Sequence, residues 1–272
     1  MELQIIGQDR AVEIHWPEFV FLPSDPWGVA FRQGLATLDF NGTRVLDAGC
    51  GSGISSLQVL LQSQPQALYL NDASERVIAV ARQNVSRFNG HVSIGFLPGD
   101  IVDVLANWSA DPLDCVIGCV PQVPARGDDL TLSDVLAHEY DDVRHPEFRE
   151  WGLGLIHNLK VAAKKALAPH GKLVLVHSGR VPASVRRQLD EAVGFRETRV
   201  VHQSMVKHHY GTPLSYLAGV REPVLFRDII GTEPIAPEEA EALRQRYIRG
   251  YIGHEEFTVH HSVLVVESMP AE

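Results

Sequence analysis

The chain has 272 residues, of which 45% are hydrophobic and 21% charged, so it is long enough to bury a sizeable core. Its 24 basic and 34 acidic residues give a net charge of −10, which argues against nonspecific nucleic-acid binding as the main activity without excluding a local basic patch. No segment approaches the ~18 apolar residues of a membrane-spanning helix, and the sequence from Met1 does not begin as a secretory signal. We therefore expect a cytoplasmic protein without a membrane segment.

The cysteine pattern bears on metal and redox chemistry. Cys50, Cys115 and Cys119 are odd in number, lack the paired spacing of a metal site, and fall in or beside expected core strands. We expect buried thiols and no metal.

The first 40 residues precede the first strong strand pattern. In the segment Val20–Trp27 two prolines bracket a Ser-Asp pair, and Trp27 opens a helical pattern that extends to Leu38. One interpretation is a loop pinned by a buried tryptophan. The other is a lid over a ligand pocket, with Asp25 and Trp27 facing the ligand.

A strand, a tight turn and a helix N-terminus follow one another between Val45 and Ile54. An apolar run ends in an acid, three glycines occupy alternate positions, and an amphipathic segment begins, so we expect a strand over 44–48 and a helix over 55–62. Glycines permit a sharp turn and a close approach of the backbone to a ligand. The residues that define the turn are Asp47, Gly49, Gly51 and Gly53.

The glycine spacing differs from that of the dinucleotide fingerprint, in which a pyrophosphate meets the helix N-terminus. An acid at the strand end would repel a pyrophosphate but could accept hydrogen bonds from an ammonium group. The combination resembles the first motif of the class I S-adenosylmethionine-dependent methyltransferases. The resemblance implies that Asp47 and the three glycines bind S-adenosylmethionine, which methyl transfer converts to S-adenosylhomocysteine.

An acid also ends the second strand pattern, expected over 67–72. Asp72 lies 25 residues after Asp47, close to the ~20-residue separation at which such folds place a carboxylate on ribose hydroxyls. The alternative is an N-cap for the following helix, a role that Ser74 could take instead. We expect Asp72 to bind the ribose.

A third acid follows the strand expected over 91–96. The position of Asp100 resembles the methyltransferase position that bonds the adenine amino group, and Ile101 would then lie against the ring. A plain turn aspartate is the alternative. Ligands of open α/β sheets bind at the carboxyl ends of the strands, where all three acids are expected.

The alternation of strand and helix patterns predicts a doubly wound, Rossmann-like α/β fold. The class I methyltransferase resemblance implies seven strands, mostly parallel, with an antiparallel last strand. Further strands are expected over 113–118, 172–177, 195–201 and 257–266, and further helices over 75–88, 153–168, 183–192 and 237–249. We expect a single domain over 1–272, divided into a lid segment (1–40), a cofactor-binding core (41–202), a cap insertion (203–255) and the last strand (256–267). Dimer contacts are the alternative role for the insertion.

The segment after the fourth strand resembles one particular group of methyltransferases. Gly118–Gln122 (Gly-Cys-Val-Pro-Gln) is similar to a Gly-Cys-Ile-Pro-Gln run in the methyltransferase domain of methionine S-methyltransferases. Residues 21–27, 151–156 and 226–235 resemble further stretches of that domain. Amino-group methyltransferases commonly have Asn-Pro-Pro-Tyr at this strand end, and only Pro121 matches that pattern here. The long aminotransferase-like region of the methionine S-methyltransferases has no counterpart among the matched stretches.

Residues 125–150 form a polar segment, longer than a minimal loop, of the kind that carries substrate contacts. An amino-acid acceptor needs a carboxylate for its ammonium group and a cation for its carboxylate. A solvated acidic loop is the alternative, and His138 and His145 are expected at the surface because no third ligand is nearby. The candidate substrate-binding residues are Asp25, Trp27, Tyr140, Asp141, Arg144 and Trp151.

Methyl transfer from a sulfonium is an in-line displacement in which positioning supplies much of the catalysis. A thioether acceptor carries no proton and needs no general base, whereas an amine or hydroxyl usually does. Cys119, Pro121 and Gln122 are expected to position the acceptor, and none is a convincing base. We therefore expect S-methylation of methionine or a related small thioether, with aromatic faces stabilising the cationic centres.

Two alternatives stay open. One is an N-methyltransferase that acts on a small amine or a protein side chain. The other is a non-catalytic partner subunit with a methyltransferase fold. The glycine spacing disfavours a nicotinamide dehydrogenase, and the number of chains in the assembly is open.

Overall fold

The computed structural model describes residues 1–88, 90–122, 148, 151–210, 214, 217, 226–228 and 235–271. Tyr140, Asp141 and Arg144 lie outside the described residues, as do His138 and His145. In the described part of the chain, the helices are α1 (Pro26–Leu35), α2 (Ile54–Gln62), α3 (Glu75–Val85), α4 (Ile101–Ala106), α7 (Gly154–Ala166), α8 (Ala183–Val193) and α9 (Pro237–Ile248).

Most of the strands belong to one large sheet. Its members are β3 (Arg44–Ala48), β4 (Ala67–Asp72), β5 (Ser93–Pro98), β6 (Leu113–Gly118), β7 (Leu167–Ser178), β8 (Phe195–Lys207), β9 (Phe226–Asp228) and β10 (Val259–Pro270). The order is β5-β4-β3-β6-β7-β10-β8, and β9 pairs with β10. Neighbours from β5 to β7 are parallel, whereas β10 is antiparallel to each of its partners. The expected mostly parallel, Rossmann-like sheet with an antiparallel last strand is confirmed, with β9 as a short addition.

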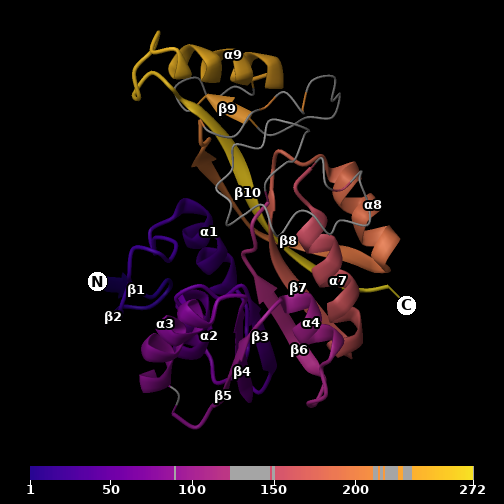
Figure 1. Cartoon of the computed structure of the whole chain (residues 1–272). Coiled ribbons are helices and arrows are strands. Elements are labelled where there is room, and N and C mark those ends of the chain that lie inside the picture. Colours follow the sequence, from indigo (N-terminus) through magenta and orange to yellow (C-terminus); the bar gives the residue numbers. More distant parts are fainter. Residues whose placement is uncertain are drawn as a thin grey trace.

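Helices cover both faces of the sheet, with α1, α2 and α3 on one side and α4, α7 and α8 on the other (Figure 1). Successive residues of a strand point to opposite faces. On β3, Val45 therefore packs into the core under α1–α3, and Leu46 packs into the core under α4 and α7. Because both faces are covered, β3 is apolar on both sides, as is typical of parallel strands.

Several regions differ from the sequence-based expectation, and strand β8 continues to Lys207, six residues past its expected end at Val201 and into the expected cap insertion. Strands β1 (Glu2–Gln4) and β2 (Ala11–Glu13) form an unexpected hairpin before α1. Helix α4, one and a half turns long, was also unexpected. Strand β7 begins five residues before the expected start at Lys172. Its pairing with β6 shifts from Leu113↔Leu167 to Cys115↔Lys172, so the turn-like Pro-His-Gly sequence forms an irregularity within the strand.

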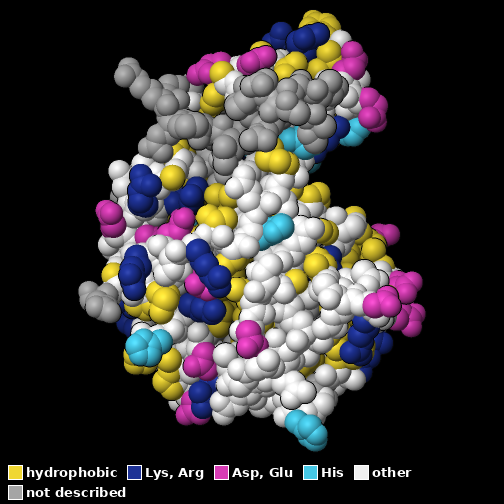
Figure 2. Space-filling view, turned by 180° about the vertical axis from the view of Figure 1, so that it is seen from behind, with side chains coloured by type: hydrophobic (Ala, Val, Ile, Leu, Met, Phe, Trp, Pro, Cys, Tyr) yellow, Lys and Arg dark blue, Asp and Glu magenta, His cyan; other side chains and the backbone are white. Residues whose placement is uncertain are grey.

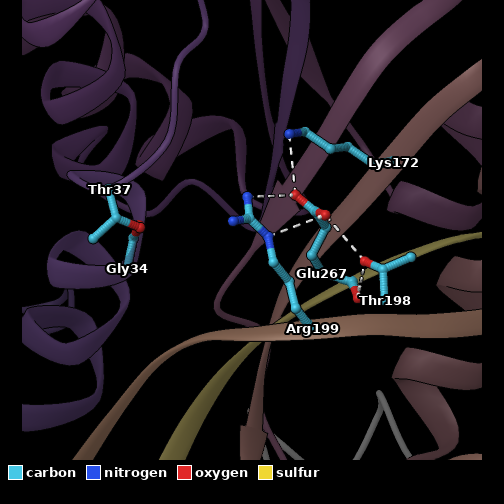
Figure 3. Close-up of polar contacts among 6 residues, drawn as sticks. All are labelled: Gly34, Thr37, Lys172, Thr198, Arg199 and Glu267. Carbon is cyan, nitrogen blue, oxygen red and sulfur yellow. Dashed lines mark hydrogen bonds and ion pairs between the residues drawn. The ribbon is translucent and has the colours of Figure 1, made fainter.

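Polar and charged side chains link strands β7, β8 and β10. Glu267 on β10 accepts hydrogen bonds from Lys172 Nζ (3.1 Å), Arg199 Nη2 (3.3 Å) and Thr198 Oγ1 (3.0 Å), as Figure 3 shows. Although burial acts to raise the pKa of Glu267, hydrogen bonds from Arg199 and Lys172 and the charge of Lys172 hold it below its usual range.

Two buried contacts are notable in the packing of the helices, one between two helices and one between a helix and the sheet. Lys160 of α7 forms an ion pair with Asp190 of α8, and both side chains are almost fully buried. Gly34 of α1 lies against β10, where an added Cβ would come within 2.8 Å of Val265. Thr37 Oγ1 donates to the Gly34 carbonyl (2.8 Å) just beyond the helix (Figure 3).

Candidate active site

The turn between β3 and α2 depends on left-handed glycines. Gly49, Gly51 and Gly53 have φ angles of 67°, 55° and 79°, a region in which other residues are strained. An added Cβ on Gly53 would lie 2.8 Å from Val85 Cγ2. The third glycine is therefore also needed for the packing of α2 against α3.

The N-terminal segment is anchored beside this turn. Asn84 of α3 is fully buried and donates to the carbonyls of Ser52 and His15, both at 2.9 Å, while accepting from the His15 N–H at 2.7 Å. Val20 is buried, and its Cγ1 would lie 4.0 Å from a Cβ on Gly51. The segment expected to form a lid therefore packs directly on the glycine turn.

The acid at the end of β3 is buried. Among the described residues, Ser56 alone donates a side-chain hydrogen bond to Asp47, at 2.7 Å to Oδ2. Burial, opposed by Ser56 and reinforced by the charge of Asp72, raises the pKa of Asp47 to about 7. A buried carboxylate of this kind is stabilised by a cation.

Asp72 ends β4 next to the same turn. Its Oδ2 accepts the Gly51 N–H (3.1 Å) and its Oδ1 accepts the Ser74 N–H (3.0 Å). Ser74, not Asp72, is the N-cap of α3, so the alternative role for Asp72 is not the one observed. Burial raises its pKa despite these two bonds. In the described part of the chain, no cationic side chain forms an ion pair with Asp47 or Asp72.

Asp100 and Ile101 follow β5 at the same edge of the sheet. Asp100 is exposed and caps α4, accepting the Val102 N–H through Oδ1 at 2.7 Å. Ile101 is buried in the core under α4 and α7. Asn71 on β4 holds this turn by donating to the carbonyls of Leu97 (2.8 Å) and Gly99 (2.9 Å).

Cys119 lies just beyond β6. It is half-buried, whereas Cys50 and Cys115 are buried as expected. Burial, together with the charges of Asp25 and Asp47, raises the pKa of the Cys119 thiol to about 12. The thiol therefore stays protonated at neutral pH. Asp25, from the N-terminal segment, and Asp47, from β3, are thus both close enough to Cys119 for their charges to act on it.

Gln122 is buried, and its amide is occupied by β7. Its Nε2 donates to the Val176 carbonyl (2.7 Å), and its Oε1 accepts the Ser178 N–H (2.9 Å). Pro121 beside it is half-buried. Gln122 thus fixes the segment after β6 to the end of β7.

Asp25 and Trp27 are adjacent to this segment. Asp25 is the N-cap of α1 and accepts the N–H groups of Trp27 (2.8 Å) and Gly28 (3.1 Å). Trp27 is half-buried, and its ring centroid lies 5.7 Å from that of His261. Both are therefore close to the end of the sheet where Asp47 and Cys119 lie.

Trp151 has a different environment from the other candidates. It is half-buried and packs against the core under α4 and α7 and against a second apolar cluster near α9. That cluster contains Leu214, Leu217, Ala240, Ile252, Phe257 and Val259.

Arg180, which no sequence motif singled out, also belongs to this edge of the sheet. It follows β7 by two residues, is 5% exposed, and its Cζ lies 6.0 Å from the Trp27 ring centroid. Its position just after the end of a strand could have marked it as a candidate binding residue, because ligands of such sheets bind there. His261, from distant β10, gave no comparable signal.

The described residues contain no group of three or more His, Cys, Asp or Glu side chains placed to hold a metal ion. None of the described helices is long and apolar enough to cross a membrane.

Comparison with known proteins places the chain in a family. Residues 39–210, more than half of the chain, match the family model described as a methyltransferase domain. The ribosomal protein L11 methyltransferase of Ectopseudomonas mendocina (strain ymp) is 37% identical over 150 residues, covering 47% of this chain and 49% of that protein. The methionine S-methyltransferase of Zea mays is 22% identical over 268 residues, covering 86% of this chain and 24% of that protein.

A solved structure of a candidate methyltransferase from Bacillus halodurans C-125 shares the fold, with a TM-score of 0.50 and 13% identity over 88% of this chain and 96% of that one. The chain spans about half or less of the length of the two curated relatives. With the fold, the glycine turn after Asp47 and the family match in agreement, the chain belongs to the methyltransferase domain family.

Proposed function

We propose that this methyltransferase methylates the sulfur of methionine, or of a related small thioether, and releases a sulfonium product. The observation that carries the proposal is the chemistry of the segment after β6. The Cys119 thiol is held protonated, and both polar atoms of the Gln122 amide are bonded to β7. Among the described residues, this segment offers no general base, which a thioether does not need and an amine or hydroxyl does.

The cofactor fits the charge of the site. The buried Asp47 and the half-buried Asp72, both with raised pKa values and with no paired cation in the described residues, favour a ligand that brings positive charge. When bound, S-adenosylmethionine supplies an electrophilic methyl group on a sulfonium. In this proposal Asp47 accepts from its ammonium group, Asp72 from its ribose hydroxyls and Asp100 from its adenine amino group. Ile101 lies against the adenine, and Gly49, Gly51 and Gly53 let the backbone approach.

The remaining residues position the acceptor. Gln122 holds the backbone of Cys119–Gln122 in place through β7, and this fixed segment sets the line of approach of the sulfur. The half-buried face of Trp27 and the carboxylate of Asp25 stabilise positive charge as the acceptor becomes a sulfonium. The N-terminal segment, anchored through Asn84, excludes water from this end of the sheet.

Two further observations support a small acceptor. The similarity to the Zea mays methionine S-methyltransferase extends over 86% of this chain. Basic and acidic side chains are interspersed over the face shown in Figure 2, without a continuous basic stripe along its described surface. Such a stripe is expected of a protein that tracks a nucleic-acid backbone.

Methylation of a protein side chain is the second candidate. It is favoured by the 37% identity to the ribosomal protein L11 methyltransferase, although that match covers only 47% of this chain. This candidate would need a base from outside the described part of the segment after β6.

The test is an acceptor panel with methyl-labelled S-adenosylmethionine, read by mass spectrometry. The panel contains methionine, other small thioethers, small amines and ribosomal protein L11. Label on the methionine sulfur supports the proposal, and its loss in Asp47→Ala assigns the activity to this site. Label on L11 or on amines alone would replace the proposal with N-methylation.

A further inference from the structure

We propose that Arg180 binds the carboxylate of the amino-acid acceptor, beside Trp27 and His261. The inference rests on the proposed function and names the residue that selects an acid over its uncharged analogues.

Arg180 is held rigidly at the end of β7. Its backbone N–H (3.2 Å) and its Nε–H (2.9 Å) both donate to Ser178 Oγ. The Ser178 N–H in turn donates to Gln122 Oε1 (2.9 Å). A continuous chain of hydrogen bonds therefore joins the acceptor-positioning segment after β6 to the guanidinium, so the two are placed relative to each other before any ligand arrives.

The guanidinium is buried without a counter-charge. Arg180 is 5% exposed, and in the described part of the chain no carboxylate lies within ion-pair distance of it. Its Cζ lies over the Trp27 ring, a contact that stabilises a cation only weakly. Burying a charge without a partner is costly, so such an arginine favours an anionic ligand. The planar fork of a guanidinium matches a carboxylate in particular.

His261 supplies a second unsatisfied group beside Trp27. It is 2% exposed, and neither ring nitrogen has a hydrogen-bond partner among the described residues. Burial, with the nearby charges of Arg180, His208 and His260, holds its pKa well below the usual range, so the ring is neutral. A neutral imidazole offers one hydrogen-bond donor and one hydrogen-bond acceptor, and a methyl acceptor bound beside Arg180 would satisfy them.

Opposite charges then lie near Trp27. Asp25 caps helix α1 by accepting the Trp27 backbone N–H, and its charge acts on Cys119. Arg180 approaches the same Trp27 ring from β7. A zwitterionic amino acid, with an ammonium group for Asp25 and a carboxylate for Arg180, matches this arrangement, whereas a peptide-bound residue has neither charge.

The experiment compares methionine with methioninol, which lacks the carboxylate, in the wild type, Arg180→Gln and Arg180→Lys. Arg187→Gln, which changes an exposed arginine of α8, is the matched control. Loss of a charge-assisted bidentate contact is expected to raise the KM for methionine by about 100-fold in Arg180→Gln with little change in kcat. Turnover of methioninol should be unchanged, so the preference for methionine collapses. Arg180→Lys should retain part of it.

Calorimetric titration gives a readout that does not depend on turnover. Methionine is titrated into each protein saturated with S-adenosylhomocysteine, after the affinity for S-adenosylhomocysteine itself has been measured. We expect Arg180→Gln to lose methionine binding while keeping its affinity for S-adenosylhomocysteine within about two-fold, because the proposed function places the cofactor on Asp47, Asp72 and Asp100 and not on Arg180.

The outcomes separate the two proposals. If the wild type methylates methionine and Arg180→Gln keeps the same KM and the same preference, the inference about Arg180 is wrong and the function stands. If Arg180→Gln weakens S-adenosylhomocysteine instead of methionine, Arg180 serves the cofactor and the inference is again wrong. If the wild type neither binds nor methylates methionine, both proposals fail.

Discussion

The carboxylate of Asp47 destabilises the ligand-free protein, and its replacement by an amide should reveal by how much. Its pKa rises from 3.8 to about 7, chiefly because the group is buried. One pKa unit corresponds to about 1.4 kcal/mol, so ionised Asp47 costs the fold about 4 kcal/mol at a pH above 7. Asp47→Asn has the same shape, can keep the bond from Ser56 and carries no charge.

The sign follows from the direction of the shift. The folded state holds the Asp47 proton more tightly than the unfolded state, so this stabilisation is fully present below the unfolded pKa and is lost as pH rises through about 7. Asp47→Asn should therefore match the wild type near pH 4. Its advantage should grow by about 1.4 kcal/mol per pH unit and level off at about 4 kcal/mol above pH 7.

Urea denaturation of the ligand-free proteins across this pH range measures the difference. Asp9→Asn, which changes an exposed residue between β1 and β2, is the control and should follow the wild type at every pH. Saturating S-adenosylhomocysteine should stabilise the wild type, by about 2.7 kcal/mol at 100 times its Kd, but not Asp47→Asn. A difference that does not vary with pH, or a less stable Asp47→Asn above pH 7, would refute the reasoning.

Three further changes test the packing of the sheet and its helices. Gly34→Ala would normally favour a helix, but here the new Cβ meets Val265 at 2.8 Å, so we expect a loss of about 1–3 kcal/mol in urea denaturation. Asp190→Asn leaves the buried ammonium of Lys160 unpaired and should cost about 3–5 kcal/mol by the same measurement. Glu267→Gln removes a carboxylate whose pKa is lowered in the fold. Its stabilisation is present above the unfolded pKa of about 4.3 and lost below it. The variant should therefore be less stable than the wild type at neutral pH, and the difference should shrink as the pH is lowered through 4; a constant difference would contradict this.

The strand-turn-helix unit around Gly49–Gly53 could be predicted from sequence because several local signals coincide there. An apolar run, a terminal acid, alternate glycines and an amphipathic helix all point to one structure, which is the one observed. The alternation of strand and helix patterns also predicted the doubly wound α/β class, whereas the mostly parallel sheet was implied by the family resemblance. Helix α4 is only six residues long, too short for a periodic pattern, and it was missed.

The partners of the site residues were less accessible to sequence reasoning. Gln122 was assigned to the acceptor from its motif, and the structure adds that its amide is bonded to β7, 54 residues away in the sequence. Trp27 and His261 meet because α1 packs against β10, a contact between the two ends of the chain. Such pairings depend on the register and order of strands, which local patterns do not carry.

The proposed function requires a nucleoside bound where β3 and β4 end, and one calorimetric titration tests this most directly. S-adenosylhomocysteine is titrated into the wild type and into Asp72→Asn, which keeps the size of the side chain but removes its charge. We expect the wild type to bind one equivalent and Asp72→Asn to bind about 10- to 100-fold more weakly, because its amide accepts the ribose hydroxyls less strongly. Equal affinity in the two proteins would place the nucleoside elsewhere and contradict the site proposed at this edge of the sheet.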